Sequence, residues 1–225
     1  AKGYEGHPHF LVPHVVGSSP KVVVSEWVEG KSMAEIIRKG TPDERDLCGT
    51  RLFELTFDAP ARVHMMHGDA HPGNFMMLPD GRMTVIDFGA VAPLPDGLPI
   101  EMGRMIRLAL DKNYEDLLPT MAKVGFIRPG EEIELESVDE MLAQYVEPLQ
   151  VPVFHYTRKW LQKHAQSNMA NAPQQLKMAR QMGLPPELAI PLRVIASTVA
   201  ISCQLNCRVP VREMAEELIP GFAEP

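Results

Sequence analysis

Three polar residues surround two short apolar segments in the middle of the chain, and their spacing restricts what the chain can fold into. The sequence is HGDAHPGNF from residue 67 and IDFG from residue 86. Residues 75–86 form two apolar runs around a Pro-Asp-Gly-Arg turn, which is typical of a β-hairpin. Because a hairpin returns the chain toward its start, we expect Asp87 to lie close to Asp69 and Asn74.

These residue types suit phosphoryl transfer from ATP. The reaction needs Mg²⁺ on the phosphates and a carboxylate that orients or deprotonates the attacking group. Mg²⁺ prefers hard oxygen ligands and keeps some of its waters, so Asn74 and Asp87 could hold it together with the phosphates. Asp69 would be the catalytic carboxylate, aimed by a turn at His67 and Gly68. The same spacing, Asp-x₄-Asn followed by Asp-Phe-Gly, occurs in the protein-kinase signature.

A purely structural role for these residues is the competing interpretation. Asp and Asn commonly form Asx turns beside hairpins, and an isolated Asp-x₄-Asn pattern would favour that role. Here HGD, HPGN and IDFG occur together at hairpin spacing, and the combination favours a metal and phosphate site. His71 precedes Pro72-Gly73, which favours a role in holding the loop. The other histidines show no spacing typical of metal ligands.

The first 30 residues are expected to contain strands. Two runs rich in β-branched residues, Leu11–Val16 and Lys21–Val28, are separated by the turn-forming sequence Gly-Ser-Ser-Pro. Such runs, bounded by turn formers, predict two neighbouring β-strands.

Helical patterns cover most of the remainder. Ser32 can cap a short helix that ends at Lys39. Thr41, followed by Pro42 and then by Glu44, has the capping-box pattern that begins a longer helix. Further helices are expected at 98–111, 114–123, 134–148, 152–168, 173–182, 186–206 and 210–219. Together with the strands and the hairpin, these helices predict an α+β fold.

One apolar run, Leu188–Leu205, is long enough to raise the question of a membrane span. It contains Pro191, Arg193 and several polar side chains, so no uninterrupted apolar span of membrane length is present. This pattern favours a buried core helix over a transmembrane helix.

Composition argues against some classes of function. With 45% apolar and 23% charged residues, the chain resembles an ordinary soluble globular protein. A formal net charge of −7 argues against a nucleic-acid-binding surface, and more weakly against attraction of a whole face to anionic lipid. Cys48, Cys203 and Cys207 form no disulfide or metal pattern. We expect Cys203 and Cys207, four residues apart in an apolar helical run, to be buried thiols, and we expect a reducing, cytoplasmic-type compartment.

The central motifs, taken together with SEWVEG at residues 25–30, resemble the UbiB/AarF-type (ADCK-like) atypical kinase-like family. Its members typically show a Glu-aromatic-Val-x-Gly hinge, a His-x-Asp-x-His-Pro-Gly-Asn loop and Asp-Phe-Gly, and the match covers about residues 10–95. The resemblance implies a protein-kinase-like fold that uses ATP and Mg²⁺. It also implies that Glu26, Trp27 and Val28 form the hinge that receives adenine. An ordinary strand end is the alternative for these three residues.

Some features typical of that family do not appear in this sequence. They are the nucleotide-clamping lysine, the αC-type glutamate, the Ala-rich phosphate loop and the Lys-x-Gly-Gln segment. Lys2 lies too close to Glu26 in sequence to be that lysine. We therefore expect residues 1–30 to be a remnant of the N-lobe strands with the hinge, and residues 31–225 to be a helical C-lobe. The partner would be a missing N-lobe segment, and the chain alone could be inactive.

The segment after Asp-Phe-Gly limits the acceptor. Residues 90–97 are short and Pro-rich, and no Ser, Thr or Tyr occurs between Asp87 and Tyr114. This disfavours peptide phosphorylation and favours a small-molecule or lipid-like acceptor, or simple ATP hydrolysis. The resemblance points to isoprenoid-quinone or lipid metabolism, with peripheral contact at a membrane.

Two alternatives remain open. A small-molecule phosphotransferase of the aminoglycoside or choline kinase type shares HGD-x-H-x-x-N and a later Asp, but it usually has an acidic residue after Ile-Asp-Trp or Ile-Asp-Phe. A nucleotide-binding pseudokinase scaffold would keep the fold, although a scaffold needs none of Asp69, Asn74 and Asp87. Phe88-Gly89 and the hinge motif favour the atypical kinase family.

Overall fold

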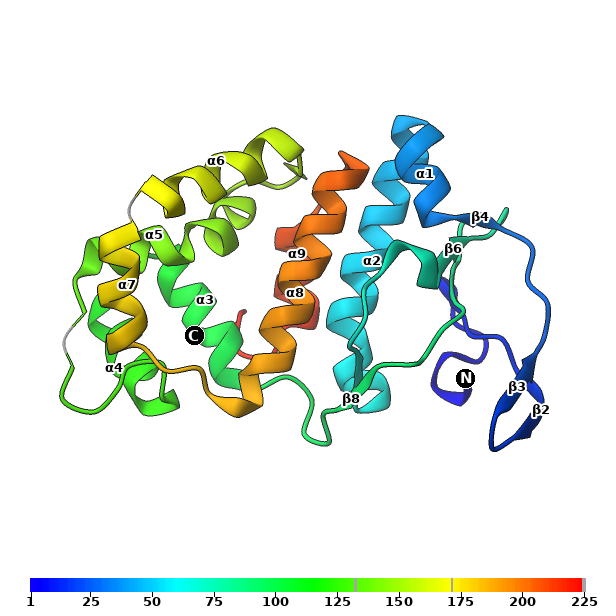
Figure 1. Cartoon of the computed structure of the whole chain (residues 1–225), viewed down its shortest axis with the longest axis horizontal. Helices are drawn as coiled ribbons and strands as arrows, with labels where there is room; N and C mark the ends of the chain where they lie inside the picture. The colour runs from blue at the N-terminus through cyan, green and yellow to red at the C-terminus, as the bar shows by residue number, and fades with distance from the viewer. Residues whose placement is uncertain (132, 171, 224–225) are drawn as a thin grey trace.

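The computed structural model describes residues 1–131, 133–170 and 172–223, and it has an elongated shape (Figure 1). Its two longest helices, α2 (Pro42–Val63) and α8 (Pro186–Leu205), pack against each other near the middle. A helical region lies on one side of this pair, and the strands of residues 10–93 lie toward the other side (Figure 1). The fold is therefore α+β with a mostly helical second part, as predicted.

The other helices lie close to the predicted ranges. They are α1 (Met33–Lys39), α3 (Ile100–Leu110), α4 (Tyr114–Val124), α5 (Leu135–Val146), α6 (Arg158–Ala170), α7 (Ala172–Gln181) and α9 (Val211–Leu218). Short 3₁₀ helices occur at Lys2–Tyr4, Pro72–Asn74 (η2) and Glu147–Gln150. The capping box is confirmed: the Glu44 N–H donates to Thr41 Oγ1 at 3.3 Å, and the Thr41 N–H donates to Glu44 Oε2 at 2.7 Å.

The strands are short and form small sheets. One sheet has the order β1-β7-β6-β4, in which β1 (Phe10–Leu11) is parallel to β7 (Met83–Val85), and β6 (Phe75–Met77) is antiparallel to both β7 and β4 (Lys31–Ser32). Antiparallel pairs join β2 (Val15–Ser19) to β3 (Val22–Ser25), β5 (Met65–His67) to β8 (Val91–Pro93), and β9 (Phe154–His155) to β10 (Arg208–Val209). The predicted hairpin at 75–86 is thus confirmed, and Phe10–Leu11 joins its sheet.

The two predicted N-terminal strands were wrong in their boundaries. Leu11–Val16 is divided between β1 and β2, because Pro13 between them has no N–H to donate to a ladder. The register pairs Ser19 with Val22, so the turn lies at Pro20-Lys21 and most of Gly-Ser-Ser-Pro belongs to β2. The second strand ends at Ser25, which leaves the proposed hinge outside it.

The predicted helix at 152–168 was wrong at its start, because α6 begins at Arg158. Residues 154–155 pair with Arg208–Val209 instead. The helix begins where Thr157 Oγ1 accepts a hydrogen bond from the Trp160 N–H at 3.0 Å, a side-chain cap that the sequence analysis overlooked.

Helix α8 is a core helix, as predicted. Its length and composition alone would allow a membrane span. However, it packs against α1, α2 and α6, and it buries Leu188, Val194 and Ile201. Thr198 and Thr56 of α2 are both buried, and their hydroxyl oxygens lie 3.0 Å apart, so the two helices share a hydrogen bond in the core.

Cys203 and Cys207 are buried free thiols, as predicted, and Cys48 is a buried free thiol as well. Burial raises the pKa of the Cys203 and Cys207 thiols to about 12, and it also raises the pKa of Cys48. Such thiols stay protonated at neutral pH, and we therefore assign them to packing and not to chemistry.

Candidate active site

Two strand pairs hold the loops that carry Asp69, Asn74 and Asp87. Strand β5 leads into the first loop, and its partner β8 follows the Asp-Phe-Gly segment, with His67 opposite Val91. Strands β6 and β7 pair Phe75 with Val85 between the two loops. The β5–β8 pair joins the start of the first loop to the end of the second, and the β6–β7 pair joins the end of the first to the start of the second. The hairpin therefore acts as the spacer that the sequence predicted.

Asp69 and Asn74 are in direct contact. The Asn74 side-chain nitrogen donates to the Asp69 backbone oxygen at 3.0 Å and to its carboxylate Oδ2 at 3.1 Å. Asn74 is 9% exposed, whereas Asp69 is open to solvent. Because the Asn74 amide nitrogen directs both of its hydrogen bonds to Asp69, the side-chain oxygen of Asn74 is the atom left to bind a cation.

Asp87 is joined to the same loop through its main chain. The His67 Nε2–H donates to the Asp87 backbone oxygen at 2.7 Å, while His67 Nδ1 accepts from the Asp69 N–H at 3.3 Å. The Ile86 N–H donates to the Asn74 backbone oxygen at 3.0 Å. One Asp87 carboxylate oxygen accepts from the Gly89 N–H at 2.7 Å, which orients the exposed carboxylate. The structure therefore brings all three predicted residues to one place.

The donor set fits Mg²⁺ better than it fits a transition metal. Asn74 and Asp87 supply an amide oxygen and a carboxylate, both hard ligands, and leave room for phosphate oxygens and water. Within the described ranges, no three His, Cys, Asp or Glu side chains gather as a metal site. His71 agrees with its predicted local role, because its Nδ1 accepts from the Gly73 N–H at 3.0 Å and caps η2.

Arg193 is a residue of this region that none of the sequence motifs assigns to the site. It lies on α8, and its Nη2 donates to the Gly68 backbone oxygen at 2.8 Å. The Gly68 N–H donates to the Ala90 backbone oxygen at 2.7 Å. Both the N–H and the carbonyl oxygen of Gly68, in the turn before Asp69, therefore have hydrogen-bond partners. The signal in the sequence is the position of a charged residue inside a long apolar run.

The proposed hinge residues lie elsewhere. Glu26, Trp27 and Val28 line an open cavity of about 640 Å³ together with the β6–β7 turn, and the lining includes none of the three loop residues. Trp27 is 88% exposed. The Glu26 N–H donates to the His14 backbone oxygen at 2.9 Å, which continues the β2–β3 ladder up to the hinge. Their adenine-binding role stays a prediction.

Comparison with known proteins places the chain in a family. Residues 1–121 match the ABC1 atypical kinase-like domain, which is more than half of the chain. The chain therefore belongs to the ABC1 atypical kinase-like family, and this confirms the resemblance inferred from the motifs. Its fold is kinase-like, and at a coarse level its class is that of an atypical kinase.

Individual relatives support this assignment. ACTIVITY OF BC1 COMPLEX KINASE 3, a chloroplastic protein of Arabidopsis thaliana, is 26% identical over 137 residues, which are 59% of this chain and 19% of that protein. An uncharacterized chloroplastic aarF domain-containing protein kinase of the same plant is 30% identical over 138 residues, which are 58% of this chain and 18% of that protein. The aligned region is thus about a fifth of each relative.

A solved structure matches the entire chain. It is the complex of Rv3197 from Mycobacterium tuberculosis with erythromycin. The two sequences are 61% identical, with a TM-score of 0.90, and the match covers 100% of this chain and 56% of that one. The helices beyond residue 121 therefore also have a close structural counterpart.

Proposed function

We propose that this chain carries the catalytic loop and metal-binding residues of an ATP-using atypical kinase or ATPase. The observation that carries the proposal is the hydrogen-bonded pair of Asp69 and Asn74, tied through the β6–β7 hairpin and His67 to Asp87. A turn-forming role alone would not require the two loops that carry these residues to be tied together.

Each of the three residues has a separate role in this proposal. Asn74 and Asp87 would hold Mg²⁺, which when bound offsets the charge of the nucleotide phosphates. Asp69 orients the attacking hydroxyl or water and accepts its proton. The two hydrogen bonds from Asn74 hold Asp69 in place for this step. Glu26, Trp27 and Val28 would receive the adenine.

The acceptor is proposed to be a small or lipid-like molecule, or water. Strand β8 and then helix α3 follow soon after Asp-Phe-Gly. The segment between Asp-Phe-Gly and α3 is therefore too short to offer an extended surface for a peptide. A role in isoprenoid-quinone or lipid metabolism, with peripheral membrane contact in the cytoplasm, belongs to the same proposal. An upstream N-lobe segment would cover the β2–β3 hairpin, whose five valines are all at least half exposed.

Macrolide binding is a second candidate function. The observation that favours it is the 61% identity, across the entire chain, to a protein whose structure was determined with erythromycin. We propose that this chain also binds macrolides, as an activity in addition to nucleotide binding.

Production of ADP from ATP tests the kinase or ATPase proposal. Purified protein is incubated with ATP and Mg²⁺, alone and then with an added aminoglycoside or choline. ADP production that does not depend on these acceptors supports the proposal. Phosphorylation of either acceptor would favour the small-molecule phosphotransferase instead, and nucleotide binding without ADP production would favour a pseudokinase scaffold.

Arg193→Met is expected to lower the turnover number about tenfold while leaving the KM for ATP nearly unchanged. The substitution removes a charged donor from the Gly68 carbonyl, so the turn that aims Asp69 loses its support. Steady-state kinetics of ADP production measure the effect, and Arg193→Lys should restore part of the rate.

The matched control is Arg104→Met, which removes an equal charge from the exposed side of α3. A fall in rate for this variant similar to that of Arg193→Met would show that overall charge is responsible. In that case Arg193 is not a positioning residue.

A further inference from the structure

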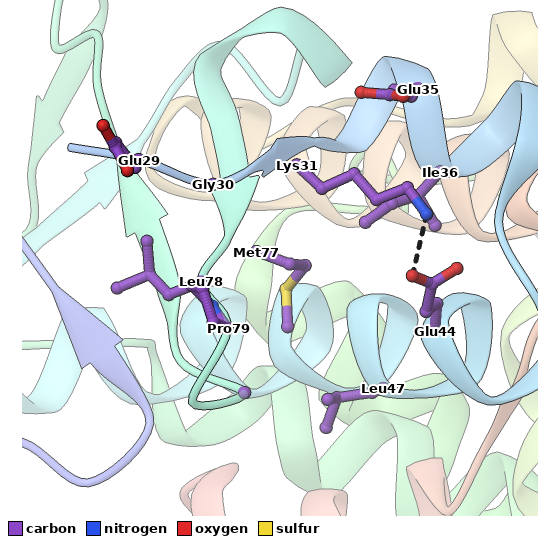
Figure 2. A pocket seen from close by; sticks show the side chains of 11 residues that line it. Glu29, Gly30, Lys31, Glu35, Ile36, Glu44, Leu47, Met77, Leu78 and Pro79 are labelled. Atoms are coloured by element: carbon purple, nitrogen blue, oxygen red, sulfur yellow. Dashed lines mark hydrogen bonds and ion pairs between the residues drawn. The ribbon is translucent and has the colours of Figure 1, made fainter.

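A second cavity lies apart from Asp69, Asn74 and Asp87, and it adjoins the hinge cavity, with which it shares Glu29, Leu78 and Pro79. It has a volume of about 560 Å³ and is enclosed by the segment 29–31, α1, the start of α2 and the end of the β6–β7 hairpin (Figure 2). Cavities of this volume are typical of sites for drug-sized ligands. The sequence offered no signal for it, because its lining comes from four separate segments of the chain.

The lining is negatively charged. It contains three glutamates and one lysine, and Lys31 Nζ lies 2.8 Å from Glu44 Oε1, the ion pair drawn in Figure 2. The hydrogen bond from Lys31 is the main cause, and the hydrogen bond from the Thr41 N–H the second cause, of a lowered pKa for Glu44. This carboxylate is therefore ionised and already paired. Glu29 and Glu35 have no basic side chain as an ion-pair partner among the described residues. The cavity therefore has an excess of negative charge at its margin.

The inner part of the lining is apolar. Met77 lies between Leu78 and Leu47 in Figure 2, and Ile36 and Pro79 complete this surface. Leu47 is 36% exposed and can contact a ligand, whereas Ile36 and Met77 are buried and support the surface from below. A ligand that fits must carry an apolar body and a positive charge. Nucleotide phosphates do not fit, since two unpaired carboxylates repel them.

We propose that this cavity binds a cationic amphiphile of the macrolide class, with the protonated amine near Glu29 and the macrocycle against Leu47 and Leu78. Erythromycin has this chemistry, because it joins a largely apolar lactone ring to an amino sugar whose tertiary amine is protonated at neutral pH. The inference rests on the macrolide-binding part of the proposed function and assigns that binding to a place in the fold.

Calorimetric titration of erythromycin into the purified protein tests the assignment. The double variant Glu29→Gln/Glu35→Gln should bind erythromycin about three- to fivefold more weakly than the unmodified protein, since the partly solvated charge contact with Glu29 is lost and the negative charge of the cavity margin falls. Erythromycin N-oxide, which keeps the size of the ligand but lacks the basic amine, should bind both proteins equally. Leu47→Ser should weaken the binding of both ligands.

Glu187→Gln, an exposed charge change at the start of α8, is the matched control and should leave the affinity unchanged. Equal unfolding midpoints for all variants show that the fold is intact. Erythromycin binding that the double variant leaves unchanged would overturn the assignment to this cavity but keep macrolide binding. If the unmodified protein does not bind erythromycin at all, the macrolide function itself is wrong, and the assignment fails with it.

Discussion

Replacing Asp69 with asparagine is expected to lower the rate of ADP production from ATP by about 100- to 10,000-fold. The amide cannot accept a proton from the attacking group, while its shape lets the Asn74 side chain keep its hydrogen bonds to the backbone and side-chain oxygens of residue 69. Binding of the nucleotide should persist, since Asp69 is not one of the proposed metal ligands. Initial rates at saturating ATP and Mg²⁺ measure the effect.

Asp96→Asn is the control for this experiment, because Asp96 is an exposed aspartate in the turn after β8. It should keep the rate of the unmodified protein. A rate within a few fold of normal for Asp69→Asn would remove Asp69 from the catalytic role. The three-residue cluster would then be a structural feature of the loop.

Phe53→Ala is expected to reduce the free energy of unfolding by about 3–5 kcal/mol, the usual cost of truncating a buried aromatic ring. Phe53 of α2 is 2% exposed, and its ring centroid lies 5.2 Å from that of Tyr156 and 5.8 Å from that of Phe57. The substitution leaves a cavity between α2 and the segment before α6. Urea denaturation followed by circular dichroism measures the change.

Phe53→Leu should cost much less, about 1 kcal/mol, because it keeps most of the volume and loses mainly the ring contacts. If the loss for Phe53→Ala were below about 1 kcal/mol, α2 would not be the centre of the core.

Patterns local in sequence predicted the parts of the site that depend on local structure. The Pro-Asp-Gly turn placed the hairpin, and the hairpin brings Asp87 back to Asp69 and Asn74. The capping box at Thr41 gave the start of α2 because its two hydrogen bonds join residues only three apart.

Contacts between distant residues could not be predicted in the same way. Arg193 and Gly68 are 125 positions apart, and only the packing of α8 beside the loop that carries Asp69 brings them into contact. The parallel pairing of Phe10 with Met83 likewise depends on the fold as a whole. Pro13 should have divided the first predicted strand, because proline cannot donate to the ladder, and this was an error of sequence interpretation.

The measurement that tests the central claim most directly is the thermal unfolding of the protein with millimolar ADP or ATP, with and without Mg²⁺, beside Asp87→Asn. A ligand that binds only the folded state adds about 2.7 kcal/mol of stability at 100 times its dissociation constant. The account predicts a rise in the unfolding midpoint that requires Mg²⁺ and is lost in Asp87→Asn. A midpoint that nucleotide does not change, or a Mg²⁺-dependent rise that Asp87→Asn retains in full, would contradict a metal–nucleotide site at Asp69, Asn74 and Asp87.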